Sequence, residues 1–146
     1  MKSTFIIIVI CFCIFSCKQK PDREELLAGK EYKYWVQVPK NEMDSMTNRI
    51  SYFDREYKNL GYFYSTILKK FYMPEFDDVF YYPTWHFIND TIIDIGTGLC
   101  RIKVLTETEF IYDFRGTEFH YKVAPMEMIP KEYQSVQSIP KELQFN

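Results

Sequence analysis

Residues 85–98 constrain the fold more than any other part of the chain. Two short runs rich in β-branched and aromatic residues flank Asn89 and Asp90, and the second run stops at a turn that holds Gly96 and Gly98. β-Branched and aromatic side chains favour strands, whereas Asn and Asp tolerate the positive φ of a tight turn. The pattern therefore predicts a β-hairpin with Asn89 and Asp90 at its tip.

Alternation of apolar and polar residues continues after this hairpin in three further segments, 99–105, 110–115 and 118–123. In the first segment, the residues that share the apolar face are Cys100, Ile102 and Val104. Successive side chains of a strand point to opposite faces of a sheet, so each segment has one buried and one solvent-facing side. The segments predict three consecutive antiparallel strands joined by short turns.

The first half of the chain has weaker signals. Its predicted elements are a helical turn at 24–28 that Gly29 ends, a strand at 31–38, a polar loop at 41–48, strands at 49–57 and 61–72 that a turn at 58–61 joins, and an irregular connection at 73–83. All five glycines fall at predicted turns. About eight strands in one such chain predict an all-β fold, an antiparallel up-and-down meander that curls into a small barrel and so removes exposed edges.

The N-terminal residues have the features of a targeting signal. Lys2 supplies a positive charge, residues 5–15 contain no polar side chain other than Cys, and Ser16 precedes Cys17. As a helix, this apolar run would span roughly 17 Å, which is short of the roughly 30 Å hydrocarbon core of a bilayer. Residues 1–16 are therefore predicted to be a signal peptide that is removed.

The segment Ile14-Phe15-Ser16-Cys17 resembles the lipobox of bacterial lipoproteins. That resemblance implies that Cys17 is acylated, carries palmitate and becomes the first residue of a protein anchored to the outer membrane. Residues 17–23 would form the lipidated Cys and a short tether. Two lysines near Cys17 replace the acidic cluster of some surface-exported lipoproteins, which favours the periplasmic face over exposure on the cell surface. The alternative is an ordinary secretory signal with a chance Cys.

Ionisable and reactive side chains form no pattern typical of catalysis. The residues considered are Glu75, Asp77, Asp78, His86, Asp90, Asp94, Cys100 and His120. The histidines lack a second ligand at zinc spacing, the hairpin aspartates are expected to cap turns, and the acidic group at 75–78 lacks the register and Gly of a calcium loop. Cys100 is expected to be a buried, inert thiol that forms no internal disulfide. We therefore expect no enzyme activity, metal or cofactor.

Aromatic residues are the remaining candidates for recognition, because a formal net charge of -2 without a basic stripe argues against binding of nucleic acid. They would line either a packed barrel interior or an amphipathic cup for one small ligand. These candidates are Tyr32, Tyr34, Trp85, Phe87, Phe110, Tyr112, Phe114, Phe119 and Tyr121. The candidate contact residues on exposed loops are Tyr62, Tyr64, Tyr81 and Tyr82.

Part of this pattern resembles the lipocalin-like lipoproteins of Bacteroidota. The segments that carry the resemblance are Leu26-Leu27-Ala28-Gly29 before an aromatic strand, Trp85 with its hairpin, and residues 101–112. The resemblance covers residues 26–123 and implies a calycin-type, lipocalin-like barrel domain at 24–124. The Trp of the first lipocalin strand would stand at position 31, which is Glu31 here. Trp35 lies on the same strand face and can replace it as the barrel plug.

The C-terminal tail, residues 125–146, contains a short repeat. Ile129-Pro-Lys-Glu-Tyr-Gln134 recurs as Ile139-Pro-Lys-Glu-Leu-Gln144. Pro followed by Lys-Glu suits the first turn of a short helix, so two turns on the barrel surface are one interpretation. A flexible or partner-docking tail is the other.

These observations lead to two functional hypotheses. In the first, a non-catalytic, membrane-anchored lipoprotein of the cell envelope holds a small amphipathic or hydrophobic ligand in its barrel. In the second, a filled barrel serves as a protein-interaction or inhibitor module that binds an envelope protein. A void of a few hundred Å³ favours the first hypothesis, and a filled interior with an exposed Tyr patch favours the second.

Overall fold

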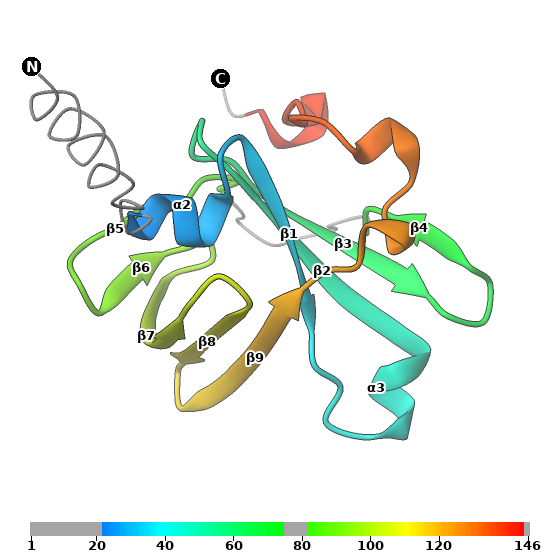
Figure 1. Cartoon of the computed structure of the whole chain (residues 1–146), viewed down its shortest axis with the longest axis horizontal. Helices are drawn as coiled ribbons and strands as arrows, with labels where there is room; N and C mark the ends of the chain where they lie inside the picture. Colours follow the sequence, from blue (N-terminus) through cyan, green and yellow to red (C-terminus); the bar gives the residue numbers. More distant parts are fainter. Residues whose placement is uncertain (1–21, 75–81, 145–146) are drawn as a thin grey trace, which may run out of the picture.

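The computed structural model describes residues 22–74 and 82–144 (Figure 1). Its helices are α2 (Arg23–Ala28), α3 (Glu42–Met46) and the short 3-10 helices η2 (Met126–Met128), η3 (Lys131–Tyr133) and η4 (Lys141–Leu143). Its strands are β1 (Tyr32–Gln37), β2 (Thr47–Asp54), β3 (Asn59–Ser65), β4 (Lys70–Tyr72), β5 (His86–Phe87), β6 (Ile92–Asp94), β7 (Leu99–Leu105), β8 (Glu109–Phe114) and β9 (Thr117–Val123). The predicted all-β, antiparallel up-and-down meander is confirmed.

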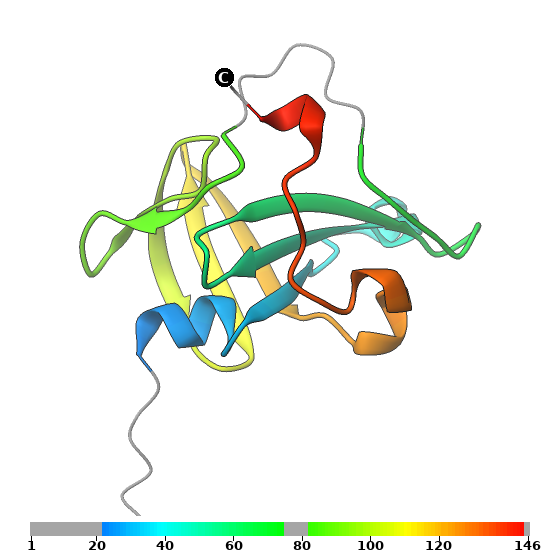
Figure 2. The same ribbon diagram turned by 90° about the horizontal axis from the view of Figure 1, so that it is seen from above.

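Within the described residues, nine strands form one sheet in the order β4-β3-β2-β1-β9-β8-β7-β6-β5, where about eight were predicted. The sheet curls into a half-barrel with β4 and β5 at its edges (Figures 1 and 2). The segment before β5 reaches the turn between β2 and β3 and joins one rim. Lys58 and Thr84 form an antiparallel bridge, and the Trp85 amide donates to the Tyr57 carbonyl at 2.9 Å.

The predicted hairpin around Asn89 and Asp90 is confirmed, because β5 pairs with β6 in antiparallel register. Its tip differs from the prediction, since neither residue has a positive φ. Instead, Asn89 Oδ1 accepts hydrogen bonds from the amides of Thr91 at 2.9 Å and Ile92 at 3.0 Å, so this side chain shapes a longer turn. The tight turn with two positive φ angles lies between β8 and β9, at residues 115–116.

The helical turn predicted at 24–28 is α2. Asp22 caps its N-terminus, because the Asp22 carboxylate accepts a hydrogen bond from the Glu25 amide at 2.6 Å. Gly29 ends the helix with a φ of 68°, and a Cβ at this position would lie 2.7 Å from the Tyr32 carbonyl oxygen. Only glycine fits this turn, which leads the chain directly into β1.

The polar segment 41–48, predicted as a loop, contains the short helix α3. Asn41 Oδ1 accepts a hydrogen bond from the Asp44 amide at 2.9 Å and so caps the first turn. No residue of α3 is buried. The helix therefore has no apolar periodicity, which is why the sequence pattern did not indicate it.

The two strands predicted between residues 49 and 72 are three strands in the structure. β2 and β3 are joined by a turn at 55–58 rather than at 58–61, and β4 is a separate strand. Tyr57 adopts a φ of 63° in this turn, a conformation that is uncommon for tyrosine. Gly61, predicted at a turn, lies inside β3, so the expectation that every glycine marks a turn was wrong.

A β-bulge changes which residue of β7 faces the core. Ile102 pairs with Tyr112, but Val104 pairs with Ile111, so one extra residue lies between the two pairs. The extra residue reverses the alternation of side chains. Leu105, rather than the predicted Val104, consequently packs against the buried cluster.

Apolar side chains cover both faces of the sheet. The inner cluster, within the half-barrel, contains Leu27, Ala28, Trp35, Phe53, Trp85, Ile93, Ile95, Cys100, Phe110, Tyr112 and Tyr121. The outer cluster, between β1–β3 and the C-terminal tail, contains Tyr34, Ile50, Tyr52, Leu60, Tyr62, Ala124 and Ile129. The N-terminal strands are therefore buried on two sides, whereas β7 keeps one solvent-facing side.

The C-terminal tail runs across β2 and β3, and its sequence repeat is also a structural repeat (Figure 2). η3 and η4 each begin directly after the proline of one repeat. The side-chain amides of Gln134 and Gln144 donate to the carbonyls of Ile129 and Ile139, in both cases at 2.8 Å. The two predicted surface turns are thus present, and each is closed by its own glutamine.

Candidate functional site

One part of the half-barrel interior is filled by aromatic side chains. Trp35 and Trp85 are buried, and their Nε1 groups donate to the carbonyls of Leu27 at 2.8 Å and Asp54 at 3.1 Å. The Phe110 ring centroid lies 5.9 Å from that of Trp35. Because both indole groups are buried and hydrogen-bonded, this part is a packed core.

A cavity of about 270 Å³ lies beside this packed core. It is lined by Arg49, Ile50, Ser51, Asn59, Gly61, Tyr62, Phe63, Pro74, Ile95, Thr97, Tyr112 and Tyr121. β2 and β3 supply one side, and β8, β9 and the turn after β6 supply the other. Ligand pockets range from roughly 300 to 1,000 Å³, and this cavity lies just below the lower end of that range, so only a small ligand would fit.

Tyr112 on β8 and Tyr121 on β9 form one wall of the cavity. Their rings are stacked, with centroids 5.8 Å apart and planes inclined by 11°. The Tyr121 hydroxyl interacts with the hydroxyls of Tyr112 and Ser51. Burial raises the pKa of both phenols above the ordinary value for tyrosine, so both remain protonated hydrogen-bond donors at neutral pH.

Gly61 leaves the opposite wall open. It pairs with Ser51 across β2 and β3, and a Cβ at Gly61 would meet no atom within 4 Å. The φ of Gly61 lies outside the left-handed region, so the backbone does not require glycine. The structural effect of this glycine is to keep space free in the middle of a strand, where a side chain would otherwise fill it.

Arg49 carries the charge of this site. Among the described residues that line the cavity, it is the only charged one. Its guanidinium lies 5.8 Å from the centroid of the Phe63 ring. Burial is the largest cause of the raised pKa of the Tyr112 and Tyr121 phenols, and the positive charge of Arg49 opposes it in part.

The structure brings together most, but not all, of the predicted lining residues. Those in or against the inner cluster are Trp85, Phe87, Phe110, Tyr112, Phe114, Phe119 and Tyr121. Of these, Tyr112 and Tyr121 line the cavity. Tyr32 and Tyr34 lie on the other face of β1, where they pack in the outer cluster. The Tyr34 hydroxyl donates to the Tyr133 carbonyl of the tail at 2.9 Å.

The predicted contact tyrosines differ among themselves. Tyr62 is buried, so it is not an exposed contact residue, and Tyr64 is half-buried. Tyr82 is 56% exposed. Tyr81 lies outside the described residues.

Nine of the lining residues were missed from the sequence: Arg49, Ile50, Ser51, Asn59, Gly61, Phe63, Pro74, Ile95 and Thr97. The available signal was the alternation in β2, where Arg49 and Ser51 share one face and Ile50 lies on the other. A polar face of this kind predicts solvent contact equally well.

Within residues 22–74 and 82–144, the candidate reactive side chains form no hydrogen bond or ion pair with one another. Burial raises the pKa of the Cys100 thiol to about 12, and Cys100 is fully buried. Asp94 Oδ1 accepts from the Gly96 amide at 2.9 Å, as expected of a turn cap, and His120 Nε2 lies 3.5 Å from Glu109 Oε1. The described residues contain no group of three or more His, Cys, Asp and Glu that could hold a metal ion. The acidic group at 75–78 lies outside them.

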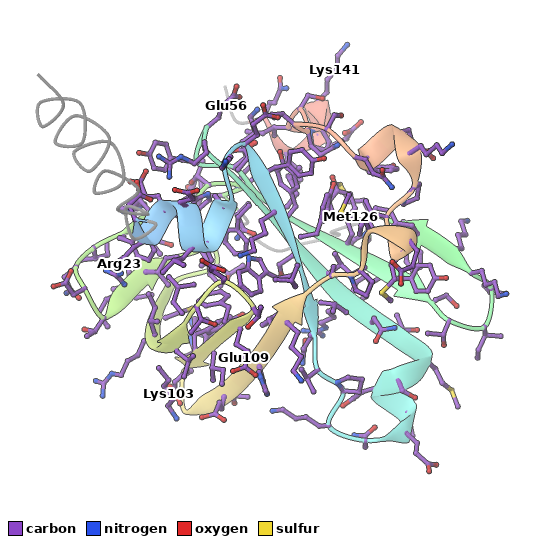
Figure 3. All side chains as sticks on the ribbon, in the orientation of Figure 1. Arg23, Glu56, Lys103, Glu109, Met126 and Lys141 are labelled. Atoms are coloured by element: carbon purple, nitrogen blue, oxygen red, sulfur yellow. The ribbon has the colours of Figure 1, made fainter. Side chains whose placement is uncertain are left out.

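A second hollow lies on the outer surface of β6–β8 and is lined by Ile92, Leu99, Arg101, Lys103, Asp113 and Arg115. Lys103 is paired with Glu118, with Nζ and Oε2 2.7 Å apart. Lys103 and Glu109 lie at the end of the sheet away from the C-terminal tail (Figure 3). This hollow is solvent-exposed and separate from the cavity.

No family model, curated protein or solved structure matches this chain. Within residues 22–74 and 82–144, no helix has the length and apolar character needed to cross a membrane.

Proposed function

We propose that this chain is a non-catalytic lipoprotein, anchored at Cys17 to the outer membrane, whose half-barrel binds a small amphipathic or hydrophobic ligand. The observation that carries the binding proposal is the cavity of about 270 Å³, kept open by Gly61 and walled by Tyr112 and Tyr121. The site combines apolar rings with a few hydroxyl donors, a composition typical of small-molecule pockets. The lipobox-like segment supports the anchor.

Anchoring is tested by labelling cells with radioactive palmitate. We expect label on the wild-type protein and none on Cys17→Ser, which should leave the membrane fraction because no acyl chain remains. Cys100→Ser is the matched control and keeps the label. A wild-type protein without label, or label that persists in Cys17→Ser, would refute the anchor.

Ligand binding is tested by native mass spectrometry of the protein purified from its own cells. We expect a non-covalently bound small molecule on the wild-type protein and its loss in Gly61→Leu, because the added side chain occupies the cavity. The control is Lys122→Leu, at an exposed position of β9 next to Tyr121 in sequence but on the other face. A bound molecule that is retained by Gly61→Leu would contradict binding in this cavity.

The alternative, an interaction module of the cell envelope, is favoured by a different observation. Met43, Ile67 and Leu68 are 78%, 70% and 73% exposed, and they lie on two adjacent elements, α3 and the turn between β3 and β4. The Thr66 amide donates to the Met46 carbonyl at 3.0 Å and holds these elements together. Exposed apolar groups of this kind mark protein contacts.

This alternative predicts that an envelope protein is crosslinked to wild-type protein in cells and lost in the double variant Ile67→Ser, Leu68→Ser. Leu99→Ser, at an exposed leucine on β7, is the control. Equal crosslinking in all three proteins would exclude this surface as the contact.

A further inference from the structure

The charge of the cavity indicates which small molecules it accepts. Arg49 is the only charged residue among the described residues that line it, and none of the ion pairs found within residues 22–74 and 82–144 involves Arg49. A guanidinium at the edge of an apolar cavity, without a carboxylate partner of its own, is a ready partner for an oxyanion.

Neutral hydroxyl groups line the same cavity as this cation, on Ser51, Tyr112 and Tyr121. The hydroxyls of Tyr112 and Ser51 both interact with that of Tyr121, and the charge of Arg49 acts on both phenols. Burial keeps the phenols protonated, so they can donate to an anion and do not compete with it by carrying negative charge themselves. The cavity therefore combines one cation with neutral hydroxyl groups.

The remaining walls suit a compact apolar body. Phe63 and Ile95 line the cavity, and the space in front of Gly61 is free of atoms within 4 Å of a Cβ built there. A single cation matches a singly charged group better than a dianion such as a phosphate monoester, because no second positive charge is present in the described lining.

We propose that the ligand is a small amphipathic carboxylate, with its carboxylate on the Arg49 guanidinium and on one hydroxyl of the Tyr112–Tyr121 pair, and with its apolar body between Phe63 and Ile95. This inference rests on the proposed function, since it names the chemical class of the ligand that the cavity binds. It also assigns Arg49 the role of selecting anions over neutral analogues.

The test compares acids with matched alcohols by NMR titration of the purified Cys17→Ser protein, which keeps every described residue. The probes are octanoate against 1-octanol and 3-phenylpropanoate against 3-phenyl-1-propanol. We expect each acid to bind about tenfold more tightly than its alcohol, because a hydrogen bond to a charged group is the stronger one. Arg49→Met is expected to remove this preference, and Arg101→Met, in the separate outer hollow, to retain it.

Two further outcomes separate this inference from the proposed function. If acids and alcohols bind equally and Arg49→Met changes neither, the carboxylate inference is overturned, but the cavity remains the binding site provided that Gly61→Leu weakens all four probes. If no probe binds, or if Gly61→Leu leaves binding unchanged, both proposals fail. Thermal unfolding of each variant confirms that a loss of binding is not a loss of fold.

Discussion

Asp54, at the end of β2, is a buried carboxylate that holds the turn between β2 and β3, the turn that pairs with the segment before β5. It is fully buried. Its Oδ1 accepts from the amides of Glu56 and Lys58, both at 2.9 Å, and its Oδ2 accepts from the Tyr52 hydroxyl at 2.8 Å. Lys58 Nζ lies 3.8 Å from Oδ2 and supplies a nearby positive charge. One carboxylate therefore fixes the turn at 55–58.

The same network connects the turn to the rest of the molecule. The Asp54 carbonyl accepts from Trp85 Nε1 at 3.1 Å, and the Tyr52 hydroxyl accepts from the Gln137 amide of the tail at 2.9 Å. Figure 3 shows Glu56 and Lys141 at the same edge of the molecule, where the turn and the tail meet. Loss of the carboxylate should thus affect the inner cluster and the tail together.

We predict that Asp54→Ala lowers the free energy of unfolding by about 3–5 kcal/mol. Hydrogen bonds to a charged group contribute about 1.5–3 kcal/mol each, and removal of one partner of a buried ion pair typically costs about 3–5 kcal/mol. The three hydrogen bonds and the ion pair share one carboxylate, so their contributions do not simply add. Domains are stable by only about 5–15 kcal/mol, which makes this a large fraction of the total. Asp54→Asn keeps one carbonyl oxygen and should lose less.

The assay is urea unfolding followed by the fluorescence of the two buried tryptophans. Asp90→Ala is the control, because the Asp90 side chain is fully exposed and its nearest cation, Arg23, is 3.4 Å away. This control is expected to change stability by less than about 0.5 kcal/mol. The reasoning is refuted if Asp54→Ala loses less than about 1 kcal/mol or no more than Asp90→Ala.

Three further predictions concern the tail, the buried thiol and the cavity wall. Deletion of residues 125–146 removes Ile129 and uncovers the rest of the outer cluster, and it should cost about 3 kcal/mol or more in urea unfolding. Burial raises the pKa of the Cys100 thiol to about 12, so the folded chain keeps a proton that the unfolded chain releases near pH 9; the free energy of unfolding should fall as pH rises from 9 to 12, and less steeply in Cys100→Ala. Gly61→Ala should raise thermal stability by about 0.5–1 kcal/mol, because its backbone needs no glycine, whereas Gly116→Ala, at a φ of 80°, should lower it.

The sequence predicted the bounds of the C-terminal strands to within one residue. The prediction succeeded because one face of these strands is exposed to solvent. β7 occupies 99–105 as predicted, and β9 begins at Thr117, one residue before the predicted start. Regular alternation survives only where one side chain in two meets solvent. The bulge in β7 escaped prediction because one inserted residue leaves the pattern locally ambiguous.

β2 and β3 were harder to predict because the C-terminal tail covers their outer face. Ile50 and Leu60 pack under the tail while Phe53 faces the inner cluster, so apolar residues occur on both sides and their period is lost. No local sequence pattern in the tail indicates that it packs on β2 and β3. Its contacts join positions far apart in the chain, as in the hydrogen bond between Tyr34 and Tyr133.

The cavity could not be predicted for a related reason. In a strand pattern, Arg49 and Ser51 are indistinguishable from solvent-facing residues, and Gly61 is indistinguishable from a turn glycine. These three residues differ from solvent-facing or turn residues because Tyr112 and Tyr121, from the second half of the chain, line the same cavity. Aromatic content alone predicted that wall but could not tell which aromatic residues fill the interior and which border a space.

Gly61 links these observations to function. A glycine in the middle of a strand lowers stability. At Gly61 neither a left-handed backbone nor a close neighbour requires glycine. A Cβ at this position would meet no atom within 4 Å, so only a larger side chain such as leucine would fill part of the cavity. The chain instead leaves a space directly opposite two neutral phenols and beside its one unpaired lining cation among the described residues. Incomplete packing of this kind is expected at a site that a ligand fills. Ligand binding should therefore raise the free energy of unfolding and offset the stability that the glycine costs.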